Sequence, residues 1–229
     1  MTVTDPSSSP RAGESAVHAH TGAWVAQVLR RRISAGDLRP GAKLAEQALS
    51  EELAVSRNTL REAFTALAAE SIVQRVPNRG VFVASPDAED IRDVYQVRRM
   101  LEPAALLWGE LTPEREAELH RVRAAIAVAL EAGDADGMAG ANQRLHDTIV
   151  AMSGSPTLSI AMDRTLARMR LVFHRMEDPS DFHARYAERN LRLLDLVLTG
   201  RRGESAQALR GYLVSAEREL LDHLGHQGH

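Results

Sequence analysis

The spacing of apolar residues divides the chain into two parts with different periods. Up to about residue 85, stretches with helical spacing are followed by two short apolar runs typical of strands. From there to the C-terminus, every apolar stretch keeps the helical spacing. The pattern therefore predicts a mainly α-helical protein with one small β element in its N-terminal part.

The N-terminal part is expected to form three helices and a hairpin. Helices are predicted at about residues 23–35 and 45–53 and from Ser56 onward. Ile72 begins a first strand, the sequence PNRG makes a tight turn, and residues 81–83 make a second strand. Two helices joined by a short turn and followed by such a hairpin form a winged helix-turn-helix. The residues expected on the buried stripe of the first helix are Trp24, Val28, Leu29 and Ile33.

The third helix begins with polar and basic side chains. Ser56 is expected to cap it, because a serine hydroxyl can accept a hydrogen bond from a backbone N–H of the first turn. A helix N-terminus carries partial positive charge, so arginines there are unfavourable unless an anion approaches. In the major groove of DNA, arginine can bind guanine, asparagine adenine, and a threonine methyl thymine. An ordinary helical hairpin with solvated arginines is the alternative. The residues expected to point outward are Arg57, Asn58, Thr59 and Arg61.

Charge is distributed unevenly, although the formal net charge of the whole chain is only −3. Residues 21–85 contain nine Lys and Arg against six Asp and Glu, whereas residues 86–229 contain 18 against 23. A basic module suggests a polyanionic partner, although a solvated surface explains the same count. Arg79, at the expected hairpin tip with Asn78, can reach a phosphate or the minor groove.

Two stretches of the N-terminal part, LSEELAVSRNTLREA and NRGVFV, are specific in combination. Together with the turn GDLRPG they resemble the DNA-binding domain of the GntR family of bacterial transcription regulators, over nearly all of residues 23–84. Gln47 stands where family members often carry another DNA-contacting arginine, a departure that bears on one phosphate or base contact. The residues that the resemblance implies in DNA contact are Ser56, Arg57, Asn58, Thr59, Arg61, Arg79 and Gly80.

The C-terminal part is expected to form six helices with short connections, which is typical of an antiparallel bundle. This layout, with VYQVRRMLEPAA in the first helix and N-x-x-L-H-D in the third, resembles the all-helical FCD effector domain of FadR-like GntR regulators over roughly residues 89–223. The resemblance implies a domain that senses a ligand and dimerises. The expected helices span about residues 88–109, 113–132, 134–153, 158–176, 182–199 and 204–224.

Arg98 falls on the apolar stripe of the first of these helices, close in angle to Ile91. A charge on an inward face is costly unless it is paired. Glu102, four residues later, offers a structural ion pair. The alternative is a guanidinium that binds the carboxylate of a ligand bidentately. The resemblance favours this second interpretation, since related domains use an arginine here near their effector.

The metal site of many FCD domains is degenerate in this sequence. That site consists of an Asp or Asn and a His four residues apart, plus one His on each of two later helices. Asn142 and His146 match the first pair, but the later positions fall on Asn190 and Tyr212. One imidazole among such side chains is a poor site for Zn²⁺ or Ni²⁺. We therefore expect no metal cofactor, with a divalent metal held through Asn142 and His146 as the alternative.

The same side chains can instead bind a small polar molecule directly. Arg98 can supply the positive charge that a metal would otherwise bring. We expect a pocket that binds a small carboxylate without metal, and a satisfied polar cluster with no ligand is the alternative. The residues expected to line this pocket are Arg98, Asn142, His146, Asn190 and Tyr212.

Composition narrows the remaining possibilities. The chain has no cysteine, so it has no disulfide framework and no thiolate metal site. No apolar run approaches the roughly 18 residues that a membrane span requires. Residues 1–20 are rich in Ser, Pro and Gly, lack the apolar region of a secretory signal, and are expected to be a disordered tail. We expect a cytoplasmic protein with no membrane partner.

These patterns combine into one prediction of architecture and function. Residues 21–85 are expected to form a winged-helix DNA-binding domain, and residues 86–229 a six-helix, ligand-sensing and dimerising bundle. The predicted protein is a homodimeric transcription regulator that binds an inverted-repeat operator in double-stranded DNA. A small organic acid is expected to modulate its affinity. No catalytic signature is present, so we expect no enzyme. The alternatives are an α-helical enzyme with an appended DNA-binding module and a DNA-binding protein with a non-sensing C-terminal domain.

Overall fold

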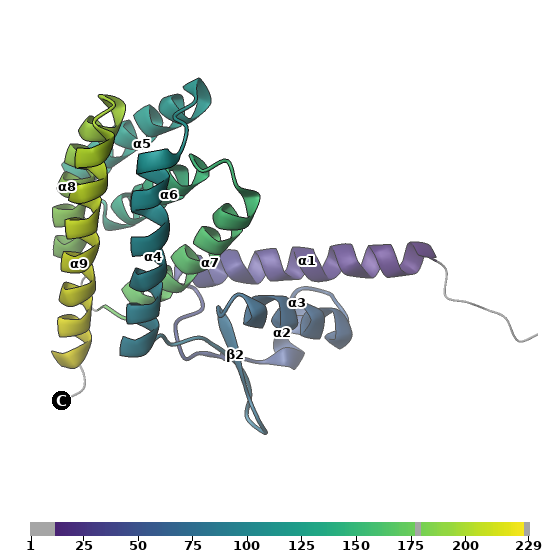
Figure 1. The fold of residues 1–229 in the computed structure, drawn as a ribbon. Helices are drawn as coiled ribbons and strands as arrows, with labels where there is room; N and C mark the ends of the chain where they lie inside the picture. The colour runs from purple at the N-terminus through teal and green to yellow at the C-terminus, as the bar shows by residue number, and fades with distance from the viewer. Residues whose placement is uncertain (1–11, 177–179, 227–229) are drawn as a thin grey trace, which may run out of the picture. The chain divides into compact units, whose positions relative to one another are not determined.

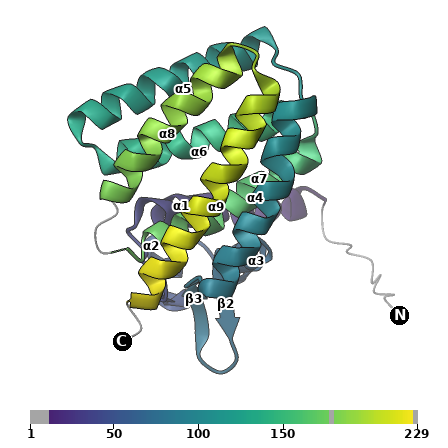
Figure 2. The same cartoon turned by 60° about the vertical axis from the view of Figure 1, so that its left-hand side comes forward.

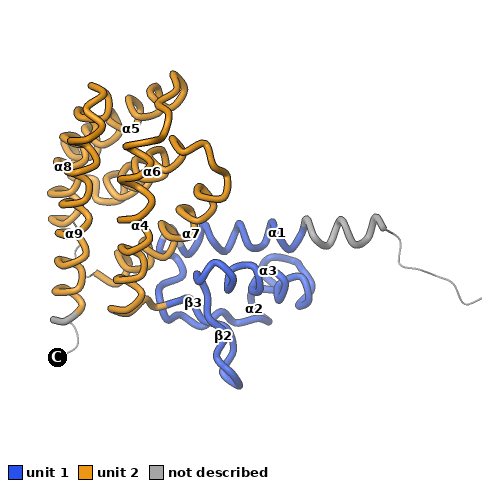
Figure 3. The backbone as a smooth tube through the Cα atoms, viewed as in Figure 1, with its two compact units in different colours: residues 1–84 blue, residues 85–229 orange. Residues whose placement is uncertain are grey.

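The computed structural model describes residues 12–176 and 180–226. The chain divides into two compact units, residues 1–84 and residues 85–229 (Figure 3). The division falls one residue before the boundary expected from the sequence. Residues 1–11 of the expected tail lie outside the described residues.

The first unit is a winged helix-turn-helix, as the sequence predicts. Its helix α3 (Arg57–Ala69) packs against α1 (Ala12–Ala35) and α2 (Glu46–Glu52). The apolar face of α3 includes Leu60 and Phe64, both almost completely buried. Helical spacing of apolar residues is therefore enough to find this face.

Two features of α1 differ from the sequence prediction. The helix begins at Ala12 and so includes residues 12–20 of the expected tail. Alanine occurs three times in that stretch and is the strongest helix former. Trp24 is 48% exposed, whereas Val25 is fully buried. The buried stripe of α1 is thus rotated from the expected one, because the apolar residues of this helix fit more than one register.

Three short strands complete the first unit. β2 (Val73–Val76) and β3 (Gly80–Val83) pair antiparallel as the predicted hairpin (Figure 1). β1 (Lys43–Leu44) pairs antiparallel with the other edge of β3, so the strand order is β1-β3-β2. The sequence prediction missed β1, since two residues are too few to show alternation.

The second unit is the predicted six-helix bundle. The helices α4 and α9 lie side by side along their lengths in both views (Figures 1 and 2). Helix α6 packs against α4, α5, α7 and α8. No helix in the described part of the chain combines the length and the apolar character needed to cross a lipid bilayer. The helices are α4 (Ala88–Trp108), α5 (Pro113–Ala132), α6 (Ala135–Ala151), α7 (Pro156–Phe173), α8 (Ser180–Leu198) and α9 (Arg202–His226).

One continuous apolar core joins these helices, and polar side chains are buried beside it. Ile91 of α4, Leu145 of α6, Leu194 of α8 and Leu213 of α9 all belong to this core and are inaccessible to solvent. Buried polar groups are unusual unless they are hydrogen-bonded. The polar residues buried on these same helices include Arg98, Glu102, His146 and Asn190.

Candidate DNA-binding surface and effector site

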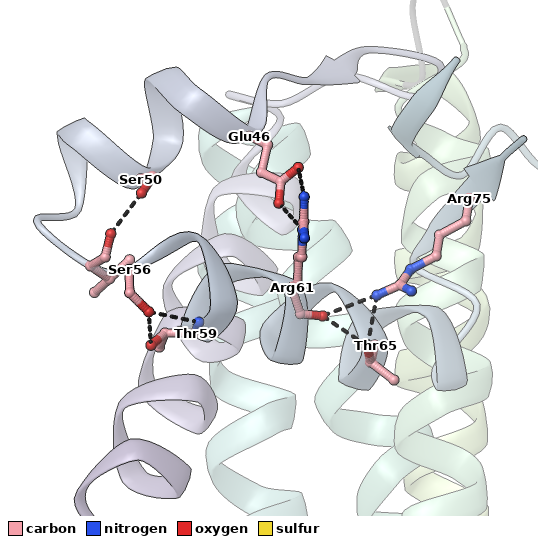
Figure 4. Close-up of polar contacts among 8 residues, drawn as sticks. Glu46, Ser50, Ser56, Thr59, Arg61, Thr65 and Arg75 are labelled. Carbon is pink, nitrogen blue, oxygen red and sulfur yellow. Dashed lines mark hydrogen bonds and ion pairs between the residues drawn. The ribbon is translucent and has the colours of Figure 1, made fainter. Parts of the chain in front are cut away.

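The start of α3 matches the sequence prediction at Ser56 and differs from it at Thr59. Ser56 caps the helix, and its Oγ accepts a hydrogen bond from the backbone N–H of Thr59 at 3.1 Å (Figure 4). Thr59 is only 3% exposed, and its hydroxyl lies 2.8 Å from that of Ser56. It faces inward because it lies one turn before the buried Ala63. Thr59 therefore stabilises the helix start instead of pointing outward.

The other polar side chains at this helix start are exposed. Arg61 forms an ion pair with Glu46 at the start of α2 (Figure 4). Asn58 donates from Nδ2 to Oε1 of Glu62 at 2.9 Å. Arg57 forms no hydrogen bond or ion pair with any residue that the structure describes. Since the first turn of α3 has no acidic residue, Arg57 adds to the partial positive charge of the helix terminus.

Two residues beside α3 were missed by the sequence analysis. Glu46 neutralises Arg61, although the two are 15 positions apart in sequence. Arg75 on β2 donates from Nη2 to the backbone oxygen of Arg61 at 3.0 Å and to Oγ1 of Thr65 at 2.7 Å (Figure 4). It adds a further exposed cation next to α3. Its position in the hairpin, four residues before Arg79, is the signal that could have found it.

The tip of the β2–β3 hairpin presents Arg79 to solvent. Asn78 and Gly80 have φ angles of 60° and 111°, and glycine adopts such values at little cost. The guanidinium of Arg79 lies over the ring of Phe82, 5.7 Å from its centroid. The turn therefore holds an exposed cation at the end of the wing, where the sequence predicts one.

In the bundle, the five residues expected to line a pocket come together with Glu102. We call these six residues the polar cluster. Arg98 donates from Nε to Oε1 of Glu102 at 2.6 Å, so the ion pair inferred from their spacing is present. Oε2 of Glu102 accepts from Nδ1 of His146 on α6, also at 2.6 Å. Glu102 thus joins Arg98 to His146, a role that the sequence analysis did not assign to it.

The second half of the polar cluster contains Tyr212, Asn142 and Asn190. The Tyr212 hydroxyl donates to Oδ1 of Asn142 at 3.0 Å and lies 3.3 Å from Nε2 of His146. Asn190 donates from Nδ2 to the same Asn142 oxygen at 2.8 Å. A tyrosine hydroxyl has a single proton to donate. Because that proton is donated to Asn142, the Tyr212 oxygen can only accept a hydrogen bond from His146. Nε2 of His146 can therefore bond to Tyr212 only when Nε2 is protonated.

The ionisation states in the polar cluster follow from burial and from the Arg98–Glu102 pair. Burial opposes the charge of Arg98, but Glu102 raises its pKa above the ordinary value. Burial likewise raises the pKa of Glu102, but Arg98 and His146 outweigh it and hold that pKa below its usual value. Burial lowers the pKa of His146, an effect that Glu102 opposes. At neutral pH the polar cluster therefore contains one cation, one anion and a neutral imidazole.

Two atoms of the polar cluster are buried without a partner. Nη2 of Arg98 and Oδ1 of Asn190 have no hydrogen bond within the described residues. The first is a charged donor and the second a neutral acceptor. An unsatisfied buried polar atom costs about 1–3 kcal/mol, so each of these two atoms would be stabilised by a hydrogen-bonding partner.

Comparison with known proteins assigns both units. The family model for bacterial regulatory proteins of the gntR family matches residues 21–83, and the model of the FCD domain matches residues 93–215. The chain belongs to the GntR family. It is a DNA-binding transcription regulator with an FCD domain, and the prediction that it is not an enzyme is confirmed.

Individual relatives of this GntR regulator agree with the assignment. An HTH-type regulator in the TAR-I ttuE-ttuC' intergenic region of Agrobacterium vitis is 30% identical over 145 residues, 61% of this chain and 85% of that protein. The gluconate operon repressor of Bacillus subtilis is 32% identical over 135 residues, 58% of this chain and 55% of the repressor. A crystal structure of a GntR regulator from Rhodococcus sp. RHA1 has a TM-score of 0.81 at 33% identity, covering 88% of this chain and 97% of that one.

The donors of the polar cluster do not fit the divalent metal that some FCD domains bind. In the part of the chain that the structure describes, no group of three or more His, Asp or Glu side chains is placed to hold a metal ion. The only imidazole of the polar cluster, that of His146, already bonds to Glu102. Zn²⁺ and Ni²⁺ favour several nitrogen ligands, and this GntR regulator offers one at the position.

Proposed function

We propose that the regulator is a homodimer that binds an inverted-repeat operator and changes its operator affinity when a small carboxylate enters the polar cluster. A two-fold dimer matches two half-sites related by the same symmetry. The effector acts by binding more tightly to one arrangement of the two winged helices than to the other. The observation that supports a ligand is the pair of unpartnered atoms in the polar cluster, Nη2 of Arg98 and Oδ1 of Asn190.

The exposed start of α3 supports the DNA part. Arg57 and Asn58 are solvent-accessible there, and Arg57 is already free of protein partners in the described residues. Arg61 can exchange Glu46 for a base or a phosphate, since exposed ion pairs contribute little to stability. Arg79, with the backbone of Gly80, would contact the minor groove or a phosphate from the wing. The buried Thr59 acts through Ser56 and makes no direct contact.

The guanidinium of Arg98 can serve two carboxylates at once. Its Nε–H is engaged by Glu102, whereas Nη2 has no partner in the described residues. A ligand carboxylate that accepts from Nη2, while its own hydroxyl donates to Oδ1 of Asn190, would satisfy both atoms. The ligand therefore needs a carboxylate and a nearby donor, as in a small hydroxy acid.

Binding of such an anion is coupled to proton uptake. The polar cluster is neutral overall before binding, so a carboxylate would add an uncompensated buried charge. His146 can remove this cost by taking a proton, because its Nδ1–H already faces Glu102 and its Nε2 faces the Tyr212 oxygen. Since binding raises the pKa of His146, affinity should increase as pH falls toward the ordinary histidine value of about 6.5.

Titration of the full-length protein with small hydroxy acids tests this function. A ligand should raise the thermal stability, bind more tightly at pH 6 than at pH 8, and change operator affinity. Tyr212→Phe keeps the ring but removes the hydroxyl bonded to Asn142, so it should weaken the response. Tyr186→Phe is the matched control, because it removes a hydroxyl that bonds to Arg189 and keeps the ring that packs against Tyr212.

A second candidate is a regulator whose bundle does not sense a ligand. The completed bonds between Arg98, Glu102 and His146 favour it, since they satisfy much of the polar cluster from within. In that case no carboxylate would stabilise the protein, and Tyr212→Phe would leave operator binding unchanged. Chelator treatment of protein purified without a polyhistidine tag tests the metal-free part. We expect no stoichiometric Zn or Ni and no change in ligand affinity.

A further inference from the structure

A groove separate from the interior of the polar cluster lies between α8 and α9. Its volume is about 500 Å³, within the range of about 300–1,000 Å³ typical of small-molecule sites. All of its walls come from two helices of one unit. The residues that line it are Arg189, Arg192, Leu193, Leu196, Ala208, Leu209, Gly211, Tyr212 and Ser215.

The groove has positive charge and no acidic lining residue. Arg189 lies against the ring of Tyr186, with its guanidinium carbon 4.9 Å from the centroid. Arg192 is exposed. Neither forms an ion pair with a carboxylate in the described residues. A pair of arginines without carboxylate partners beside a concave surface is a place where an anionic group gains charge-assisted hydrogen bonds.

The rest of the groove is apolar and open. Leu193 and Leu209 are buried in the bundle core and line the groove, and Leu196 is half-buried. Gly211 has no side chain, and a Cβ placed there would meet no atom within 4 Å. The absence of a side chain at this position therefore keeps the groove open.

We propose that this groove is a binding site for a small amphipathic anion, a molecule with one carboxylate or sulfonate and a flat or extended apolar body. The anionic group would bind Arg192 and Arg189, and the apolar body would cover the leucines and occupy the space above Gly211. A purely polar acid would leave the leucine surface uncovered, and a neutral apolar molecule would leave the arginines unpaired.

Tyr212 connects the groove to the polar cluster. Its side chain lines the groove, and its hydroxyl donates to Asn142 and lies beside His146. An occupant of the groove would therefore contact a residue of the polar cluster without entering it. The arginines and the leucine surface that support a site in the groove do not require a ligand inside the polar cluster.

The probe for this site is 8-anilinonaphthalene-1-sulfonate, an amphipathic anion whose fluorescence rises on binding. The full-length protein should bind one molecule per chain. 2-Naphthoate should displace it, whereas 2-naphthylmethanol, with the same apolar body and no charge, should not. Gly211→Leu would fill the groove, and Arg192→Gln would remove a charge. Each substitution should weaken probe binding by roughly tenfold or more. Arg192→Gln removes one charge-assisted contact, and Gly211→Leu fills the space that the probe would occupy.

Two control variants test whether a loss of probe binding is specific to the groove. Gly203→Leu places the same side chain on the same helix, also in open space but outside the groove. Arg210→Gln removes an exposed charge of α9 that does not line it. Leucine forms helix better than glycine, so Gly211→Leu should fold. Both controls should bind the probe like the unsubstituted protein.

Several outcomes would overturn the proposal. Unsaturable probe binding would do so, as would equal affinity in Gly211→Leu and Gly203→Leu. Displacement by the neutral alcohol, or full affinity in Arg192→Gln, would show that the groove does not require an anionic group. Either result would contradict the proposed ligand class. A change of subunit assembly in Gly211→Leu alone, measured by sedimentation, would identify the groove as a contact between two copies of the chain instead.

Discussion

Arginines occur in opposite surroundings in the two units, and the difference explains what each unit can do. Arg57 is exposed at the start of α3 and has no partner in the described residues. Arg98 is 2% exposed and is held by Glu102 within the bundle. The first is available to a large external anion such as DNA. The second lies inside the bundle, out of reach of a partner of that size.

Removing the same charge therefore has different costs in the two units. An exposed guanidinium contributes little to folding, so its loss should appear in binding. A buried pair is strongly destabilising when one partner is removed, because the other charge remains in a water-poor interior.

Removal of the buried carboxylate should have the largest effect. Glu102→Gln leaves Arg98 without its counter-charge and should lower the free energy of unfolding by about 3–5 kcal/mol. Glu118→Gln, which breaks the ion pair with Arg121 on the surface of α5, should cost no more than about 1 kcal/mol. Chemical denaturation of the full-length proteins measures both. Equal losses in the two variants would show that burial does not determine how much stability is lost when a carboxylate is removed.

Acid should destabilise the bundle through His183. Burial, partly offset by Asp136, lowers the pKa of His183 from 6.5 to about 4. Between these pH values the unfolded chain binds a proton that the folded chain does not, so stability is complete above about pH 6.5 and falls toward about pH 4. The expected loss from this group is roughly 3 kcal/mol.

Substitution of His183 isolates its part of the acid sensitivity. His183→Leu preserves an apolar contact with Phe173, whose ring centroid lies 4.8 Å from the imidazole, and should flatten the fall between pH 6.5 and 4. His120→Gln, at an exposed position of α5, is the control and should leave the curve unchanged. An unaltered curve in His183→Leu would assign the acid sensitivity to other groups.

Loss of the exposed arginine should affect DNA binding alone. Arg57→Ala should weaken operator binding by about 1–3 kcal/mol if the side chain contacts a base or a phosphate. Its thermal unfolding should be unchanged, because the side chain has no partner in the described residues to lose. Fluorescence anisotropy with labelled operator gives the affinity. Wild-type affinity in this variant would remove Arg57 from the interface.

The wing arginine should have the smallest effect and the least sequence dependence. Arg79→Ala should weaken binding to operator and to unrelated DNA by similar factors. It should also reduce the salt slope of the binding constant by about 1, as loss of one phosphate contact does. Titrations at several salt concentrations provide the slope. Weakening confined to the operator would assign Arg79 to a base instead of the backbone.

The fold was largely predictable because helical spacing is strong in long segments. All six bundle helices were found, with α5 at its correct bounds. The inward direction of Arg98 and its pairing with Glu102 also follow from spacing along one helix. Contacts between separate elements could not be predicted this way. The link from Glu102 to His146 joins positions 44 residues apart, and no local pattern records it.

The outcomes at the start of α3 have the same physical origin. Ser56 was identified because a cap acts within one turn. Thr59 was assigned to the exposed face because polarity suggested it, yet threonine can be buried when a neighbouring hydroxyl satisfies its own. Arg75 was missed because its relation to α3 depends on how the hairpin packs.

The most direct measurement of the central claim is selection of bound DNA from a random library, carried out with the full-length protein and with Arg57→Ala. The unsubstituted protein should enrich one inverted repeat, with two half-sites at a fixed spacing, and Arg57→Ala should enrich it weakly or not at all. Enrichment of a single unrepeated half-site would contradict the dimeric operator complex. Equal enrichment of the same repeat by both proteins would contradict the assignment of the exposed arginine to DNA recognition.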